Sequence, residues 1–189
     1  WTHPVYSLGG LRIADIDGDG KAEIIYDNSN NASGTTIFII LSGTGQKVGE
    51  FQVSSKGYYF TVVNWPGRQG KPHILLTDDA KISIMDFTGK TLAVLDAPGC
   101  AAFGDVEAAN VRLIKGEADF LAVKKSLHPD LSTLYVYDSK GILKYQKTER
   151  ALVLPPVLFT LPAGESERLL VGSQKDDQAA LLEYTWLAK

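Results

Sequence analysis

The chain has 189 residues, which is enough for one domain with a sizeable core and short for two. Its formal net charge of −3, its pI of about 5.6 and the lack of a Lys/Arg run argue against a nucleic-acid-binding surface or a basic membrane-binding patch. The lone Cys100 cannot form an internal disulfide, and no apolar run approaches the ~18 residues of a membrane-spanning helix.

Along the chain, short β-branched and aromatic segments recur with a regular period. Segments of one type contain Glu23, His73, Asp119 and Arg168 at equivalent places, at intervals of 50, 46 and 49 residues. In each unit the first strand is expected ahead of these positions, and the second strand contains them. A third strand, which ends in a turn, follows. Gly45, Gly89 and Gly141 close three of these turns, as tight hairpins require. A fourth strand is expected after each such turn.

Four strands in a unit of roughly 40 to 50 residues are typical of a β-propeller blade. We therefore predict an all-β chain, a single domain or propeller fragment made of about four four-stranded antiparallel blades. The expected blade boundaries are residues 9–54, 55–98, 99–149 and 150–189.

The ends of the chain and the third unit leave alternatives open. The fourth unit lacks its last strand, and an extra strand-like segment at 2–8 is expected to complete that blade. The chain forms either a small closed ring or half of a larger ring, in which case self-association is possible. Residues 100–116 fit either a helical turn or an edge strand that leads into a strand at 110–114.

The first unit carries a dense acidic loop, "ADIDGDGKAEII". Asp15, Asp17, Asp19 and Glu23 lie within nine residues, and the glycines between them permit a tightly curled backbone. Carboxylates 4 Å apart repel by up to about 4 kcal/mol at an effective dielectric of ~20, so a cation is expected among them. Calcium, which takes about 6–8 oxygen ligands, fits this oxygen-rich loop better than magnesium.

The expected ligands are the four carboxylates and the backbone carbonyl of Lys21. In an EF-hand the bidentate Glu would fall at loop position twelve, where this chain has Tyr26, so the loop is of another type. A solvated turn without metal is the competing interpretation, because Asp and Gly favour turns on their own account. If a metal binds, we expect it to stabilise the fold and not to bind a substrate.

The segment "IADIDGDGKAEII" resembles the FG-GAP, or VCBS, repeat of integrin α-subunit propellers and many bacterial secreted proteins. Asp15, Asp17, Asp19, Gly20 and Glu23 match the motif positions, whereas the other three units resemble only the blade. The resemblance implies a calcium ion in a hairpin loop between two blade strands. It also implies a binding or scaffold module that presents blade loops to a protein or carbohydrate partner.

An enzyme is the competing function, because calcium-loaded propellers of a similar repeat type also form polysaccharide lyases. No convergent set of catalytic residues or catalytic motif is found, so no catalytic residue is predicted. Tyr58, Tyr59 and Trp65 lie near a loop end, where their rings could stack on a sugar or a partner. Packing in the blade core explains Tyr58 and Tyr59 equally well. A calcium site suits an extracellular, periplasmic or cell-surface location, where calcium is abundant.

Overall fold

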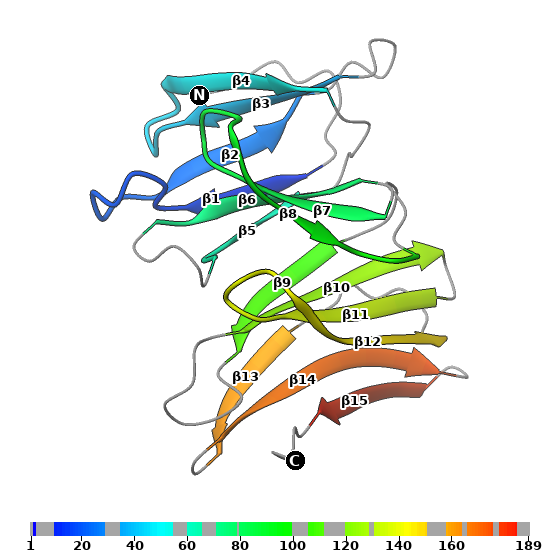
Figure 1. Ribbon diagram of the computed structural model, residues 1–189. Helices are drawn as coiled ribbons and strands as arrows, with labels where there is room; N and C mark the ends of the chain where they lie inside the picture. Colours follow the sequence, from blue (N-terminus) through cyan, green and yellow to red (C-terminus); the bar gives the residue numbers. More distant parts are fainter. Residues whose placement is uncertain are drawn as a thin grey trace.

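A computed structural model shows an all-β chain (Figure 1). It describes residues 2, 10–28, 35–54, 60–65, 71–78, 80–99, 106–111, 120–128, 131–150, 158–163, 166–175 and 178–184. In this part of the chain fifteen strands form four sheets. No helix there is long and apolar enough to span a membrane.

Each sheet is an antiparallel meander in which strands pair in chain order. The first sheet contains β1 (Leu11–Ala14), β2 (Glu23–Asp27), β3 (Thr36–Leu41) and β4 (Lys47–Val53). The second contains β5 (Phe60–Val63), β6 (His73–Asp78), β7 (Lys81–Met85) and β8 (Thr91–Asp96). The third contains β9 (Val106–Val111), β10 (Phe120–His128), β11 (Leu131–Tyr137) and β12 (Leu143–Arg150), and the fourth contains β13 (Leu158–Ala163), β14 (Ser166–Lys175) and β15 (Gln178–Tyr184).

The burial of the strands follows their place in the sheet. The central strand β3, "TIFIIL", is apolar after its first residue and is almost wholly buried, because both of its faces are covered. The outermost strand β4 buries only Phe51 and Val53 and leaves its charged residues exposed. The continuous apolar run of β3 therefore indicates a central strand of the blade, and the mixed polar and apolar sequence of β4 indicates an outer strand.

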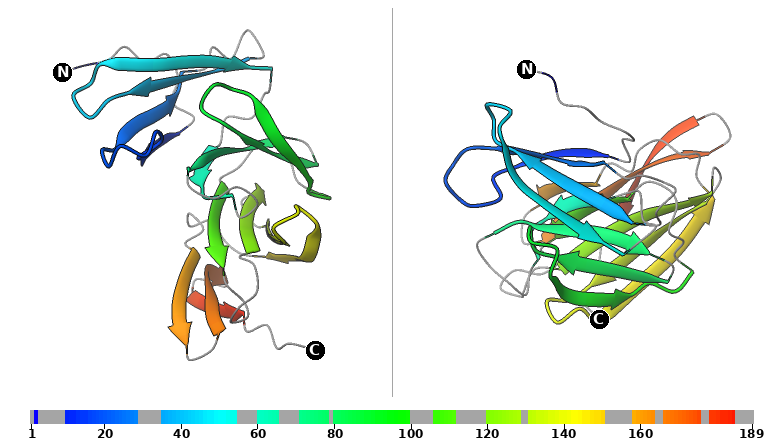
Figure 2. Two further views of the ribbon diagram at one scale, coloured as in Figure 1. Left: turned by 60° about the vertical axis from the view of Figure 1, so that its left-hand side comes forward. Right: turned by 90° about the horizontal axis from the view of Figure 1, so that it is seen from above.

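The four sheets follow one another along an open arc, with the first and fourth sheets at opposite ends (Figures 1 and 2). The first strands of successive sheets lie side by side, β1 against β5, β5 against β9 and β9 against β13. The described residues form an open arc and not the closed four-sheet ring, and the larger ring stays a prediction.

The core between the first two sheets is rich in aromatic rings. Phe38 of β3 stacks on Phe51 with 5.1 Å between ring centroids and meets Phe60 of β5 edge-on at 4.9 Å. Next to it, the guanidinium of Arg12 lies 5.7 Å from the centre of the Phe60 ring. These contacts join the two sheets directly through their inner and central strands.

The core between the second and third sheets combines apolar packing with two hydrogen bonds from tyrosines. The hydroxyl of Tyr135 donates to the carbonyl of Pro98 at 3.0 Å, and that of Tyr137 donates to the carbonyl of Asp96 at 2.8 Å. Trp65 belongs to this core and is only 6% exposed. The expectation that its ring contacts a partner is therefore wrong: this ring fills space between two sheets.

Three glycine turns connect the third and fourth strands of the first three sheets. In each turn the carbonyl of Ser42, Asp86 or Asp138 accepts a hydrogen bond from the glycine three residues later, at 2.9, 3.1 and 2.9 Å. Gly89 and Gly141 have φ of 85° and 82°, and a Cβ there would come within 2.7 Å of Phe51 and 2.8 Å of Leu95. These two glycines let each turn press against the outer strand of the preceding sheet.

The third unit differs from expectation in its first strand. The structure has a strand at Val106–Val111, paired with β10 from Phe120 to Lys125, so these residues take the strand alternative and not the helical one. The expected strand at 110–114 overlaps it by only two residues. Small side chains explain the miss, because Ala108 and Ala109 carry little strand signal in the sequence.

The fourth sheet has three strands in the described residues, as its shortened unit predicts. The segment 2–8, expected to complete this sheet, lies outside the described residues apart from Thr2.

Candidate metal centre

The acidic loop joins β1 to β2, the inner hairpin of the first sheet. Gly18 and Gly20 have φ of 84° and 85°, and a Cβ on either would have no atom within 4 Å. Their role is thus to supply the left-handed backbone of the curl and not to make room for a neighbour.

Asp15 organises the loop through its side chain. Its Oδ1 accepts hydrogen bonds from the backbone N–H groups of Gly18 at 2.7 Å and Asp19 at 3.1 Å, and its Oδ2 accepts one from Gly20 at 2.9 Å. Asp17 Oδ1 accepts a further bond from the Asp19 N–H at 3.0 Å. The sequence therefore curls around its own carboxylates, which brings them together.

Three carboxylates converge as a result. Asp15, Asp17 and Asp19 each offer one oxygen, and these oxygens lie within 4.8 Å of one another. Asp15 is half-buried, and the other two are exposed. This group could hold a metal ion, and the hard oxygen donors suit a hard cation.

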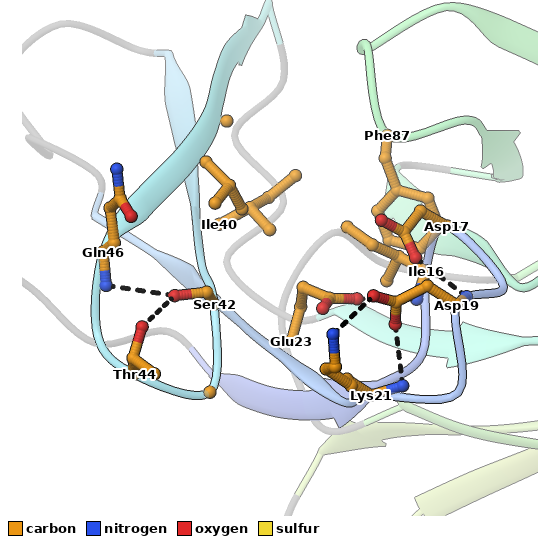
Figure 3. Close-up of a pocket in the computed structure, with 13 residues that line it drawn as sticks. Ile16, Asp17, Asp19, Lys21, Glu23, Ile40, Ser42, Thr44, Gln46 and Phe87 are labelled. Atoms are coloured by element: carbon orange, nitrogen blue, oxygen red, sulfur yellow. Dashed lines mark hydrogen bonds and ion pairs between the residues drawn. The ribbon is translucent and has the colours of Figure 1, made fainter.

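Glu23, the fourth predicted carboxylate, lies at the base of the loop. It is the first residue of β2, it is only 7% exposed, and its Oε2 accepts a hydrogen bond from the Ile16 N–H at 3.0 Å. Glu23 therefore ties the two ends of the loop together. Figure 3 shows its carboxylate directed toward Asp19.

Lys21 is the cation that pairs with the loop. Its Nζ lies 3.4 Å from Asp19 Oδ2, and its side chain is 83% exposed. The backbone N–H of Lys21 donates to Asp19 Oδ1 at 2.7 Å, and this bond is the main reason that the pKa of Asp19 lies below its ordinary value of 3.8. An exposed lysine in water offsets only part of the repulsion among three carboxylates.

The loop forms one wall of a pocket of about 560 Å³ (Figure 3). Asp17, Asp19 and Glu23 line one side, and Ser42, Thr44 and Gln46 of the first glycine turn line the other. Ile40 and Phe87 add apolar surface. The pocket thus combines carboxylates, hydroxyls, an amide and an aromatic ring.

The polar wall opposite the loop was not predicted as a site. The segment "SGTGQK" is expected only to form a hairpin turn, and it does so: the Ser42 N–H donates to the Gln46 carbonyl at 2.8 Å. The signal that could have found it is positional, because in a meander the turn after β3 returns to the same edge of the sheet as the β1–β2 loop.

Other predicted residues lie elsewhere. Tyr58 and Tyr59 fall outside the described residues, and Trp65 is in the core. His73, which served only to align the repeats, begins β6 and is buried.

Comparisons with known proteins give the fold. No family model matches the chain, and no curated protein sequence does. A solved structure, the crystal structure of BBS1N in complex with ARL6DN, soaked with lead, is similar with a TM-score of 0.55 and 13% sequence identity. The similarity covers 91% of this chain and 50% of that one, so this chain spans about half the length of its structural relative. Together with its four-stranded antiparallel sheets, this similarity shows that the chain has a β-propeller fold.

Proposed function

We propose that this chain is a calcium-stabilised, non-catalytic binding module of the FG-GAP/VCBS type, part of an exported protein, that presents its blade loops to a protein or carbohydrate partner. The observation that carries the proposal is the convergence of three aspartate oxygens within 4.8 Å on a single loop. The fold alone does not give this function, since propellers serve many roles.

Calcium is the ion that suits this loop. Asp15, Asp17 and Asp19 supply carboxylate oxygens from a mostly exposed loop, whereas magnesium prefers a rigid octahedral arrangement with several waters. Glu23 and the backbone carbonyl of Lys21 are the further ligands in this proposal. The ion offsets part of the negative charge of the loop and joins β1 to β2, so its first effect is on stability.

The pocket supports a partner with several hydroxyl groups. Calcium bound to Asp17 and Asp19 would lie at the pocket wall, opposite Ser42 and Gln46. Sugar hydroxyls can bind such polar groups, and the ring of Phe87 offers an apolar surface for the face of a sugar. An exported location follows from the same chemistry, since loosely built calcium sites fill at the millimolar concentrations found outside cells.

Isothermal titration of calcium into EDTA-treated protein, with magnesium as the comparison, tests the metal site. We expect one site that prefers calcium, and we expect Asp17→Asn to weaken it strongly while its amide oxygen still accepts the Asp19 N–H. Asp86→Asn is the matched control, because Asp86 also accepts backbone N–H groups in a turn but belongs to no carboxylate cluster among the described residues. Absence of calcium binding contradicts the proposal.

Binding assays with glycans and candidate protein partners test the proposed role as a binding module. We expect oligosaccharide binding that requires calcium and is weakened by Gln46→Ala. Depolymerisation of an acidic polysaccharide by the purified chain would instead establish the lyase-like enzyme as the function.

A further inference from the structure

The charges around the pocket of the acidic loop do not balance. Asp17, Asp19 and Glu23 line the pocket, and Asp15 belongs to the same loop, so four carboxylates lie within nine residues. Lys21 is the only cationic side chain among the residues that line this pocket. Calcium in the loop would supply two positive charges and Lys21 supplies one, which leaves one negative charge in excess. The pocket is therefore negative with calcium in the loop as well as without it.

Glu23 shows that this end of the pocket needs a cation. Its side chain is buried, yet within the described residues its carboxylate accepts only one hydrogen bond, from the Ile16 N–H to Oε2. Figure 3 shows this carboxylate directed toward Asp19, which is a second acid and not a base. Two carboxylates that face each other stay ionised when a positive charge lies beside them.

The rest of the pocket suits a sugar ring. Ser42 Oγ and Thr44 Oγ1 lie 2.9 Å apart on the wall opposite the acidic loop, and both can exchange hydrogen bonds with sugar hydroxyls. Ile40 and Phe87 add apolar surface for the face of a ring. An amino sugar has three matching features, namely hydroxyls, an apolar ring face and, when its nitrogen is not acylated, an ammonium group.

We infer that this pocket selects a glycan whose sugar carries a protonated amine over a neutral or an acidic glycan, a preference that rests on the proposed function of the pocket in glycan binding. The ammonium donates to the oxygens of Asp17 and Asp19 at the pocket wall. Hydrogen bonds between an ammonium and a carboxylate are charge-assisted and stronger than neutral ones. The excess negative charge disfavours a sugar carboxylate or sulfate in the same place.

Lys21 competes with the ligand for one of these carboxylates. Its Nζ lies 3.4 Å from Asp19 Oδ2, and its side chain is 83% exposed, so the pair is weak enough for a ligand to displace. Lys21→Gln should therefore raise the affinity for an amine, whereas a pocket that held an acidic sugar through Lys21 would lose affinity on the same change. The backbone N–H of residue 21, which donates to Asp19 Oδ1, is kept in this variant.

Isothermal titration of three tetrasaccharides into the calcium-saturated chain tests the inference, at about pH 6, where the aspartates are ionised and the sugar amine is largely protonated. The three are built from glucosamine, from N-acetylglucosamine and from galacturonate. We expect glucosamine to bind roughly tenfold more tightly than its acetylated form, whose nitrogen carries no charge. Galacturonate should bind most weakly.

Lys21→Gln should tighten the binding of the glucosamine tetrasaccharide roughly threefold and leave that of the acetylated form unchanged. Lys81→Gln is the matched control, because Lys81 is exposed and begins β7 at the end opposite Phe87, outside the pocket. It makes the same change in charge and should alter neither affinity.

The outcomes separate this preference from glycan binding itself. Equal binding of the three sugars, tighter binding of galacturonate, or weaker binding of glucosamine after Lys21→Gln would overturn the preference while leaving the glycan-binding module in place. Calcium binding with no binding of any of the three sugars would overturn the glycan-binding role together with the preference.

Discussion

Two kinds of turn in this molecule use glycine and aspartate for different purposes. The acidic loop between β1 and β2 gathers three carboxylates, and its glycines meet no neighbouring atom. The glycine turns at Asp86 and Asp138 have one carboxylate each, and their glycines press against the preceding sheet. The first kind is governed by charge and the second by packing, although the two look alike in the sequence.

The largest expected effect is a loss of stability on substitution of glycine, and it differs between the acidic loop and the glycine turns. Gly141→Ala should destabilise the chain by roughly 2–5 kcal/mol, from the left-handed backbone and from the Cβ that would collide with Leu95. Gly18→Ala has only the backbone cost, about 1–2 kcal/mol. Urea unfolding of both variants in EDTA measures the difference, and equal losses would contradict the packing role.

Calcium should act on the first kind of turn alone. Calcium at about 100 times its dissociation constant should stabilise the chain by ~2.7 kcal/mol, and EDTA should lower the melting temperature without unfolding the whole core. Asp19→Asn, which keeps an acceptor for the Lys21 N–H, should abolish the calcium effect. An unchanged melt in EDTA would remove the stabilising role.

The single carboxylate of the second kind should matter without any metal. Asp138 Oδ1 accepts from the N–H groups of Lys140 and Ile142 at 2.9 and 3.0 Å, so Asp138→Ala should cost about 1–2 kcal/mol. Thermal melts with and without calcium should show the same loss. A loss that depended on calcium would make this turn a metal site as well.

The smallest expected effect is on acid stability. Partial burial acts to raise the pKa of Asp138, but hydrogen bonds from Ile142, Lys144 and Lys140 outweigh it and leave the pKa below 3.8. A carboxyl whose pKa is lower in the folded than in the unfolded state stabilises the fold at pH values above the unfolded-state pKa. This stabilisation is lost as the pH falls through the folded-state pKa. In EDTA, stability should therefore fall below about pH 4, and Asp138→Asn should flatten that fall.

The sequence predicts much of the fold because its repeat is carried by strong local signals. The meander of strands, the glycine turns and the β-propeller class are confirmed, since β-branched runs such as "TIFIIL" and glycines after Asp or Ser leave few alternatives. The weak points are residues whose signal is ambiguous. Ala108 and Ala109 favour a strand only weakly, so the start of β9 was not predicted. Trp65 lies next to a loop in the sequence but is a core residue.

The candidate site could be predicted only in part. The three aspartates are alternate residues of one tightly curled loop, so their spacing already implies that their oxygens meet. The pocket also needs Ser42 and Gln46, which come from the first glycine turn of the same sheet, and Phe87, which follows β7 of the second sheet. Side chains brought together by packing between sheets leave no short motif in the sequence.

In each sheet of the described residues the strands pair in chain order, and this has a consequence for how the protein folds and how it could gain or lose a blade. Each strand finds its partner within a few tens of residues, so loop closure is inexpensive and each sheet can assemble next to the one already formed. Folding should therefore proceed by growth from one blade to the next. For the same reason, gain or loss of one unit of about 50 residues would lengthen or shorten the arc while keeping every remaining joint.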